Sequence, residues 1–395
     1  MSKWPVAKLG EVLKEHDNAV PANRLGEVNL AGVYSFARGL FKRGSMSPNK
    51  TSYKSYNRLV TDDFVISTPK AWEGALALVT EEFDGWFLSP VFPTFRANKE
   101  RLMPKFLEWF CKRESVWGEL QRNSRGIGAR RESVHPKQFL SLEIPLPPLA
   151  EQRHIVARIE ELAAQIQEAR ELRRQATEEA LVLFLTMLQQ TRHNLLTSKL
   201  PNLRLGKMMT VVSGGTPERD NAAFWNGGNI PWIKSGELLD SDIASAKEHI
   251  TKLAVENSSA KLFPPNTILI ALYGQGQTRG RTGRLLMAAT TNQACCAVLP
   301  KPESFEPRFV QFWLRSFYAE LREVAHGGAQ PNWTGTMIKN LPLAVPSLPE
   351  QRRIVAELDA LQAEVDSLKR LQAETAAELD ALLPAVLDRT FKGEL

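Results

Sequence analysis

Hydrophobic residues recur at spacings of three and four along two stretches of the chain, residues 155–187 and 354–386. Ten positions of the first stretch return in the second at an offset of 199 residues, and only Thr375 among them is polar. This spacing places the hydrophobic residues on one face of a helix. The sequence therefore predicts two long helices that pack as an antiparallel, coiled-coil-like pair. The expected interface residues are Ile155, Ile159, Leu162, Ile166, Leu172, Leu183, Ile354, Leu358, Leu361, Val365, Leu368, Leu379 and Leu382.

Two ordinary amphipathic helices, each covering its own domain, are the alternative interpretation of this pattern. Spacing sustained over so many turns exceeds a typical globular helix and favours the paired rod. At about 1.5 Å per residue, the first stretch would extend over roughly 50 Å. A rod of that length would follow about 15 base pairs of B-form DNA, so domains at its ends would contact separate parts of one duplex. The rod interpretation thus predicts a split recognition sequence.

Two shorter motifs repeat with nearly the same offset and define the domain organisation. Residues 149–157 (LAEQRHIVA) return as residues 348–356 (LPEQRRIVA), and residues 8–11 (KLGE) resemble residues 204–207 (RLGK). Each half of the chain therefore begins with the short motif and ends in a repeated helix. We expect a first globular domain at residues 1–143, a central helix at 144–197, a second globular domain at 198–342 and a C-terminal helix at 343–395.

Both predicted globular domains combine short strand-like runs with turns that are rich in Gly, Pro and Asn. Strands are expected at residues 64–67 and 75–79 of the first domain and at 267–272 and 294–299 of the second. Helices are expected at residues 105–110 and 308–314. The parallel order predicts an α/β (α+β) fold with two similar domains in a pseudo-repeat. The halves share little other sequence, as expected if a common scaffold presents two different binding surfaces.

Composition and charge narrow the class of protein. The chain has 395 residues, of which 43% are hydrophobic and 24% charged, as in ordinary globular proteins. Its net charge of +6 suits a polyanionic partner, and basic residues outnumber acidic ones between residues 96 and 137. Three cysteines lack the spacing of a zinc site or a disulfide framework. Without a signal peptide or a run of roughly 20 hydrophobic residues, we expect a cytoplasmic protein with no membrane partner.

Residues 274–284 (GQGQTRGRTGR) combine a flexible backbone with side chains that suit DNA. Arg can pair with guanine, and Gln with adenine, through two hydrogen bonds in the major groove. A solvated loop and a nucleotide-binding loop are the alternatives, although the third Gly of a dinucleotide-binding loop is missing. Segments before each repeated helix, at residues 122–131 and 327–333, either face DNA or form structural turns. The candidate DNA-binding residues are Arg96, Arg125, Arg130, Arg131, Lys234, Gln275, Gln277, Arg279, Arg281, Arg284, Asn292, Gln330 and Asn332.

Sequence motifs of catalysis are missing from the chain. It contains no GxxxxGK[ST] nucleotide loop, no [ND]PP[YF] motif of amino-methyltransferases and no carboxylate cluster typical of a metal-dependent nuclease. The six histidines form no recognisable site. We therefore expect no catalytic residue, no cofactor site and no metal site in this chain.

The layout resembles the specificity subunit of type I restriction-modification enzymes, which has two target-recognition domains separated by two related helices. Residues 144–152 (IPLPPLAEQ) and 345–351 (VPSLPEQ) are similar to the start of each conserved helix in that family. Residues 213–217 (SGGTP), 229–233 (NIPWI) and a block from LYG at 272 to TNQA at 291–294 are similar as well. The first domain lacks the GGTP and TNQA blocks, which leaves its DNA contacts open.

The resemblance implies a non-catalytic subunit that binds a bipartite target in double-stranded DNA and directs methylation and restriction by partner subunits. These partners would be methyltransferase subunits and a motor-nuclease subunit, which would bind S-adenosylmethionine, ATP and magnesium. A two-domain scaffold that binds protein or RNA through its long helices is the alternative, and it predicts no sequence preference on duplex DNA. A stand-alone enzyme with an unrecognised site is another, and it predicts turnover without added subunits.

Overall fold

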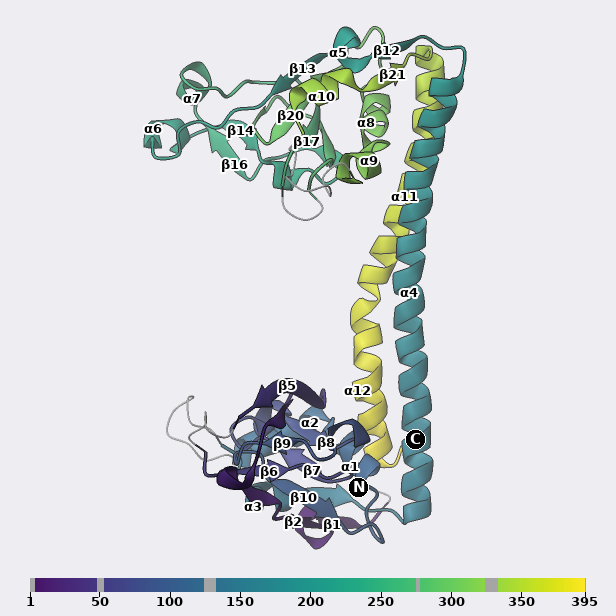
Figure 1. Cartoon of the computed structure of the whole chain (residues 1–395). Coiled ribbons are helices and arrows are strands. Elements are labelled where there is room, and N and C mark those ends of the chain that lie inside the picture. Colours follow the sequence, from purple (N-terminus) through teal and green to yellow (C-terminus); the bar gives the residue numbers. More distant parts are fainter. Residues whose placement is uncertain (1–3, 48–52, 124–132, 275–277, 324–332, 395) are drawn as a thin grey trace. The chain divides into compact units, whose positions relative to one another are not determined.

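The computed structural model describes residues 4–47, 53–123, 133–274, 278–323 and 333–394, which form two compact units (Figure 1). The first unit contains Met1–Arg173 and Gln372–Leu395, and the second contains Arg174–Leu371. Each unit combines a globular domain with part of helix α4 (Leu149–Thr197). The second unit also contains most of α11 (Leu348–Glu374), and the first contains α12 (Ala376–Lys392).

The domain of the first unit is built on two larger sheets. One is antiparallel with the strand order β2-β10-β7-β8, and the other has the order β3-β6-β9-β4-β5. Phe64 and Phe95 of the first sheet pack on the Phe139 ring, with ring centroids 5.7 and 5.1 Å away. The elements are β1 (Val6–Lys8), β2 (Leu13–Glu15), β3 (Ala19–Pro21), β4 (Val28–Val33), β5 (Leu40–Met46), β6 (Ser55–Arg58), β7 (Phe64–Ile66), β8 (Leu76–Leu78), β9 (Phe87–Leu88), β10 (Thr94–Ala97), α1 (Pro104–Cys111), α2 (Glu114–Asn123), α3 (Pro136–Leu140) and β11 (Glu143–Pro145).

The domain of the second unit also has two larger sheets, with the orders β13-β20-β17-β18-β15 and β16-β14-β19. Its core includes Ile268 and Ile270 of the first sheet together with Phe309 and Phe312 of α8. The elements are β12 (Asn202–Arg204), α5 (Leu205–Met208), β13 (Thr210–Ser213), α6 (Ala222–Trp225), β14 (Ile230–Ile233), β15 (Ser241–Ile243), β16 (Glu248–Ile250), α7 (Lys252–Glu256), β17 (Ile268–Ala271), β18 (Thr282–Leu285), β19 (Thr290–Thr291), β20 (Cys295–Leu299), α8 (Pro307–Arg315), α9 (Tyr318–Glu323), α10 (Gly335–Asn340) and β21 (Pro342–Ala344).

A four-strand sheet order is common to the two domains. The order β2-β10-β7-β8 of the first corresponds to β13-β20-β17-β18 of the second, and neighbouring strands are antiparallel in both. The predicted strands are β7, β8, β17 and β20, and the predicted helices are α1 and α8. Both helices begin with proline, which has no N–H to leave unpaired in a first turn. The predicted mixed fold with two similar domains and two long helical segments is confirmed.

The short repeated motif closes each domain at its base. Strand β1 pairs with β11, and β12 pairs with β21, so the first and last strands of each domain lie side by side. The buried Leu9 donates its backbone N–H to the Leu142 carbonyl at 2.8 Å, and the buried Leu205 donates to Leu341 at 2.9 Å. A Cβ on Gly206 would lie 2.7 Å from the Lys339 Cβ, which explains the glycine of the motif.

In the first unit, α4 packs antiparallel to α12 and against the domain. Ile155 and Ile159 of α4 share a core with Leu387 and Phe391 of α12. The Phe391 ring centroid lies 5.1 Å from that of Phe106 on α1. The helices therefore pack on each other and cover their own domain at the same time, so both interpretations of the hydrophobic stripe hold here.

In the second unit, the remainder of α4 packs with α11 in the same way. Phe184 and Leu188 of α4 share a core with Ile354 and Leu358 of α11. The Phe184 ring also lies 6.1 Å, centroid to centroid, from the Phe312 ring of α8. Helix α4 therefore contacts α8 as well as α11, and the repeated hydrophobic stripe alone did not indicate the contact with α8.

The prediction that Leu172, Leu183 and Leu382 belong to the helix interface is wrong, because all three side chains are exposed. The residue one position later is the more buried one in each case, namely Arg173, Phe184 and Leu383. Packing on two surfaces selects a face slightly rotated from the line of leucines, since 3.6 residues per turn fit no strict repeat. The other predicted interface residues are buried or half-buried: Ile155, Ile159, Leu162, Ile166, Ile354, Leu358, Leu361, Val365, Leu368 and Leu379.

The second predicted helix is interrupted at Thr375, the polar position of the stripe, where α11 ends and α12 begins. Arg173 donates from Nη2 to the Gln372 carbonyl at 2.5 Å and to the Thr375 Oγ1 at 2.7 Å. Gln372 in turn donates to the Arg173 carbonyl at 2.9 Å. Arg173 thus satisfies the polar groups that the interruption exposes.

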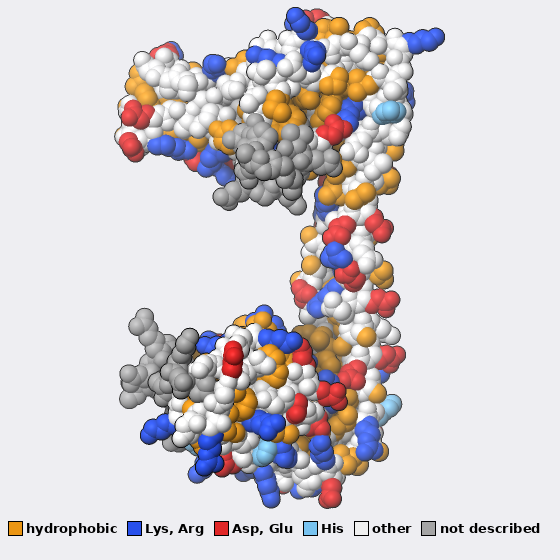
Figure 2. All heavy atoms as spheres, viewed as in Figure 1, with side chains coloured by type: hydrophobic (Ala, Val, Ile, Leu, Met, Phe, Trp, Pro, Cys, Tyr) orange, Lys and Arg blue, Asp and Glu red, His pale blue; other side chains and the backbone are white. Residues whose placement is uncertain are grey.

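The visible helix surface carries acidic, basic and hydrophobic side chains close together (Figure 2).

Candidate nucleic-acid interface

The structure describes six of the thirteen candidate DNA-binding residues. Arg96 lies in the first unit, and five residues lie in the second, namely Lys234, Arg279, Arg281, Arg284 and Asn292. The others lie outside the described residues: Arg125, Arg130, Arg131, Gln275, Gln277, Gln330 and Asn332. The candidates therefore do not form one described surface.

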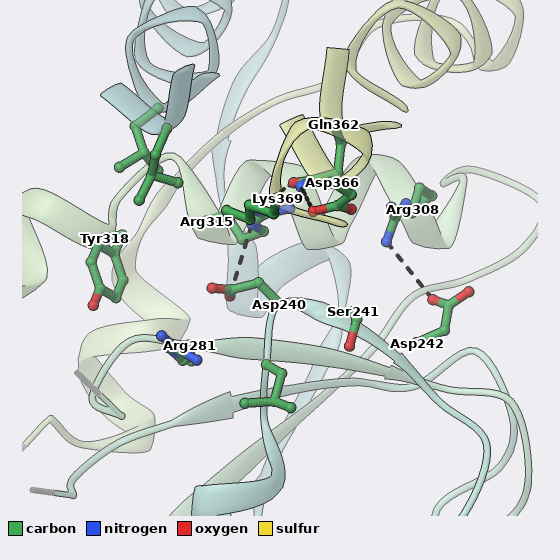
Figure 3. Close-up of a pocket in the computed structure, with 13 residues that line it drawn as sticks. Asp240, Ser241, Asp242, Arg281, Arg308, Arg315, Tyr318, Gln362, Asp366 and Lys369 are labelled. Atoms are coloured by element: carbon green, nitrogen blue, oxygen red, sulfur yellow. Dashed lines mark hydrogen bonds and ion pairs between the residues drawn. The ribbon is translucent and has the colours of Figure 1, made fainter. Parts of the chain in front are cut away.

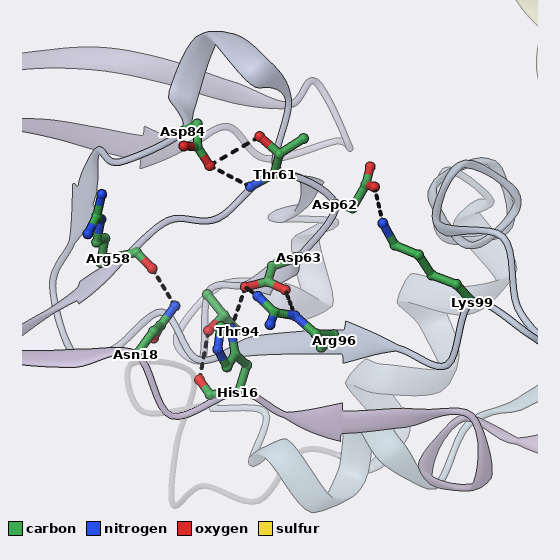
Figure 4. A network of polar contacts seen from close by, with 10 residues as sticks. All are labelled: His16, Asn18, Arg58, Thr61, Asp62, Asp63, Asp84, Thr94, Arg96 and Lys99. Atoms are coloured by element: carbon green, nitrogen blue, oxygen red, sulfur yellow. Dashed lines mark hydrogen bonds and ion pairs between the residues drawn. The ribbon is translucent and has the colours of Figure 1, made fainter.

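Arg96 on β10 forms a fork with the fully buried Asp63, which directly precedes β7 (Figure 4). Its Nε donates to Asp63 Oδ1 at 2.8 Å and its Nη2 donates to Oδ2 at 3.2 Å. His16 Nδ1 lies 2.6 Å from Oδ2. The antiparallel register of β10 and β7, in which Phe95 faces Phe64, brings Arg96 opposite Asp63. Sheet register therefore creates this cluster from residues far apart in sequence.

The fork leaves one edge of the Arg96 guanidinium for another partner. A guanidinium that binds a carboxylate through Nε and Nη2 still presents Nη1 and the second hydrogen of Nη2. The Arg96 side chain is 49% exposed. Asp63 thus holds the planar group in one orientation while solvent reaches its outer edge, which suits a phosphate oxygen or the acceptor edge of guanine.

Arg284 on β18 makes the same kind of fork with Asp242, its cross-strand neighbour on β15. Nε donates to Asp242 Oδ1 at 2.8 Å and Nη2 donates to Oδ2 at 2.5 Å. The hydrogen bonds from Arg284 hold the pKa of the Asp242 carboxyl below its usual value, and the charge of Arg308 adds to the effect. Only 22% of the Arg284 side chain is exposed, so this fork binds two strands together more than it offers a surface.

Lys234 pairs with Glu248 on β16, and Arg219 contacts the same carboxylate at 2.6 Å. The hydrogen bond from Lys234 is the main cause that lowers the pKa of Glu248. The Arg219 guanidinium also lies over the rings of Trp225 and Trp232, 4.0 and 4.5 Å from their centroids. This cluster is a cation–π and ion-pair arrangement on the smaller sheet of the second unit.

The GGTP and TNQA blocks meet in the structure. Gly214 donates its N–H to the Cys295 carbonyl at 3.0 Å, and Gly215 donates to Thr291 at 2.8 Å. A Cβ on Gly214 would lie 2.3 Å from the carbonyl oxygen of Asn292, so only glycine fits this approach. The buried Asn292 Oδ1 has no hydrogen-bond partner among the described residues. These blocks build a loop junction, and within it Asn292 keeps one unused acceptor.

Arg279 and Arg281 lie at the end of the β17–β18 connection. Gly280, with a φ of +82°, donates to the Ala271 carbonyl at 2.9 Å, and Arg281 donates to Thr278 at 3.1 Å. Arg279 Nε is buried without a partner in the described part of the chain. Arg281 lines a pocket together with Arg308 and Arg315, which the sequence analysis did not single out. The last two lie on amphipathic α8, where nothing in the sequence separates them from ordinary helix-surface arginines.

The three cysteine thiols are buried. Burial raises the pKa of the Cys295 and Cys296 thiols to about 12, and it raises the pKa of Cys111 as well. These thiols are therefore protonated near neutral pH, whereas a nucleophilic cysteine has to be a thiolate. In the described ranges, no group of three or more His, Cys, Asp or Glu side chains could hold a metal ion. No described helix is both long and apolar enough to cross a bilayer.

Comparisons with known proteins match both halves of the chain. Residues 1–178 and 198–376 each match the family described as type I restriction modification DNA specificity domain. The EcoR124I/EcoR124II specificity subunit of Escherichia coli is 29% identical over 167 residues, which cover 42% of this chain and 41% of that protein. The matched part therefore spans about two fifths of that curated relative.

Two solved structures match almost the whole chain. The crystal structure of the HsdS subunit from Thermoanaerobacter tengcongensis is 27% identical, with a TM-score of 0.65, and 99% of this chain and 97% of that chain are covered. A second chain is 27% identical. It comes from a structure described as the "structural basis underlying complex assembly and conformational transition of the type I R-M system". Its TM-score is 0.75, with coverage of 99% and 98%.

Proposed function

This chain belongs to the family of type I restriction modification DNA specificity domains, and from that membership we propose that it selects the DNA sequence on which partner subunits act. Each domain binds one part of a bipartite target in double-stranded DNA. The supporting observation is that the two domains share a strand order while presenting different candidate side chains, Arg96 in one and Arg281 in the other. A common scaffold with unlike surfaces suits two unlike half-sequences.

The proposed role is positioning, without chemistry in this chain. Phosphate contacts set the register on the duplex, and base contacts select the sequence. Methyltransferase subunits and a motor-nuclease subunit supply methylation and restriction in the cytoplasm, and they bind S-adenosylmethionine, ATP and magnesium. The protonated, buried thiols of Cys111, Cys295 and Cys296 agree with a subunit that provides no nucleophile.

Exposed hydrophobic side chains on α4 provide a surface for the partner subunits. Val182, Leu183 and Met187, all in the second unit, are between 45% and 61% exposed. Clusters of large apolar side chains on a polar helix mark protein contacts more often than scattered ones do. We assign these three residues to contact with the methyltransferase subunits.

The experiment is to co-express this chain with a methyltransferase subunit from the same genome and to map modified bases across the host genome. Methylation at one split motif, which disappears when this chain is omitted, is the expected result. Methylation that is absent, or that is the same without this chain, would contradict the proposal. The matched control is the methyltransferase subunit expressed alone at the same level.

A further inference from the structure

A cavity of about 420 Å³ lies in the second unit between the β15–β18 edge, helices α8 and α9, and the α4 and α11 helices (Figure 3). Four cationic side chains line it, namely Arg281, Arg308, Arg315 and Lys369. Three carboxylates line it as well, namely Asp240, Asp242 and Asp366. Which of these charges are already paired decides what the cavity can bind.

Arg315 is the most buried of the cations, and its guanidinium lies over the Phe184 ring, 4.7 Å from the centroid. Its side chain is only 7% exposed, and its Nη2 donates to Gln362 Oε1 at 3.0 Å. Its Nε lies 3.8 Å from Asp240 Oδ1, which is too long for a hydrogen bond. Its Nη1 is buried and has no hydrogen-bond partner among the described residues. Burial is the main cause that lowers the pKa of this guanidinium, so a nearby anion would offset the cost of its burial.

The three carboxylates already have partners. Asp242 binds Arg284, and Arg308 lies 3.8 Å from it while donating to Asp359 at 2.8 Å. Asp240 Oδ1 accepts hydrogen bonds from the Thr282 N–H at 2.9 Å and from its hydroxyl at 3.2 Å. Asp366 accepts from the Gln362 amide at 3.0 Å. Asp242 is therefore neutralised by Arg284, whereas Asp240 and Asp366 are held by neutral donors and keep their negative charge.

The remaining positive charge faces the cavity from two sides. Lys369 is exposed on α11 and has no ion pair within the described residues. Arg315 lines the cavity from α8, where its Nη1 is buried without a partner among the described residues, and Arg281 lines the wall formed by the end of the β17–β18 connection. A tetrahedral oxyanion can accept from several such donors at once and also offsets their charge, which a neutral acceptor does not do.

We propose that this cavity binds a phosphate group of the DNA backbone, held by Arg315 and Lys369. The proposal rests on the proposed function, because it requires DNA to reach the second unit. Arg281 belongs to the segment whose side chains suit base recognition, and it lines the same cavity. A phosphate fixed beside that segment would set the register in which the segment meets the bases.

The experiment uses the full chain, co-purified with its methyltransferase subunit, and measures duplex-DNA affinity over a series of salt concentrations. Lys369→Gln is the main variant because Lys369 is exposed and its loss spares the core. We expect roughly tenfold weaker binding to target and non-target duplexes alike. The slope of log affinity against log salt should fall by about 0.9, the value for one lost phosphate contact. Lys369→Arg should restore both, and the methylated motif should stay unchanged.

The matched control is Lys252→Gln, which removes one exposed lysine from α7 of the same unit. An unchanged slope for Lys369→Gln, or an equal change for Lys252→Gln, would overturn the proposal. Weaker subunit assembly with unchanged DNA affinity would assign the cavity to a protein carboxylate instead. Saturable binding of inorganic phosphate to the full chain, together with an unchanged salt dependence of DNA affinity in Lys369→Gln, would assign the cavity to free phosphate. If wild-type protein prefers no DNA sequence, the proposed function itself fails, whatever the variants show.

Discussion

Gln152 and Gln351 lie 199 positions apart and make the same three hydrogen bonds, both with fully buried side chains. Gln152 accepts from the Met103 N–H at 2.8 Å and donates to the Arg101 and Pro147 carbonyls. Gln351 accepts from the Glu306 N–H at 2.9 Å and donates to the Ser304 and Pro346 carbonyls. Each amide ties the first turn of a long helix to the segment that leads into α1 or α8, which explains the repeated Glu-Gln motif.

Gln152→Ala is expected to lower the stability of the first unit by about 3 kcal/mol, because it leaves a buried N–H and two carbonyls unpaired. Gln351→Ala should do the same in the second unit. Hydrogen exchange resolved by unit is the measurement, since a two-unit chain need not unfold in one step. Each substitution should lower protection mainly in its own unit.

The control for this pair is Gln165→Ala, which changes an exposed glutamine of α4. It should leave protection unchanged. Equal protection in all three variants would mean that the two buried amides do not join helix and domain.

Leu188→Ala is expected to destabilise the second unit by about 3 kcal/mol, whereas Leu183→Ala should change its stability by less than about 0.5 kcal/mol. Both leucines lie on α4, but Leu188 is 2% exposed and Leu183 is 54% exposed. Denaturant unfolding followed by a signal from the second unit checks this. A larger loss of stability for Leu183→Ala than for Leu188→Ala would support the helix interface that the leucine spacing predicts.

Arg96→Gln and Arg281→Gln are expected to change different halves of the methylated motif. Loss of an arginine contact to a base should relax discrimination at that base by about 1–3 kcal/mol. Methylome mapping of cells that carry each variant gives the readout, with melting curves to confirm that the domains remain folded. If one substitution altered both halves of the motif, the assignment of one half-sequence to each domain would be wrong.

Asp242→Asn is expected to make the stability of the second unit depend less on pH in the acid range. The pKa of Asp242 lies below its ordinary value of 3.8, mainly because Arg284 donates to it. A carboxylate with a lowered folded-state pKa stabilises the fold above its unfolded pKa, and this contribution is lost as pH falls through the lower folded value. Wild-type stability should therefore fall more steeply below about pH 5 than that of the variant.

Unfolding free energies measured between pH 3 and pH 7 would test this. Asp220→Asn, at an exposed position of the same unit, should keep the wild-type slope. An identical slope for Asp242→Asn would show that the fork with Arg284 does not couple to stability.

Local sequence patterns were enough to predict the repeating elements. Buried runs such as Phe64–Ile66 and Ile268–Ala271 carry their strand character within four residues, and the amphipathic spacing of α8 is equally local. The pairing of Arg96 with Asp63 could not be predicted, because these residues are 33 positions apart. Only the register between strands β10 and β7 brings them together. Arg315 was missed for a similar reason, since its burial depends on α4 and α11.

The rotation of the helix face shows where a repeat misleads. The same offset links Leu183 to Leu382, and both are exposed, because Phe184 and Leu383 take the inward positions. Which neighbour turns inward depends on the domain that packs against each helix, and that information is absent from the helix itself.

Strands β12 and β21 pair across the base of the second domain, with Asn202 opposite Ala344. The chain thus enters and leaves the second domain at one strand pair. A segment of another length between these two strands would have to close the same gap and to keep a surface for α4, as α8 does through Phe312. Exchange of that segment would then change the surface that this domain presents while both long helices stay the same, which gives selection a modular route to a new surface.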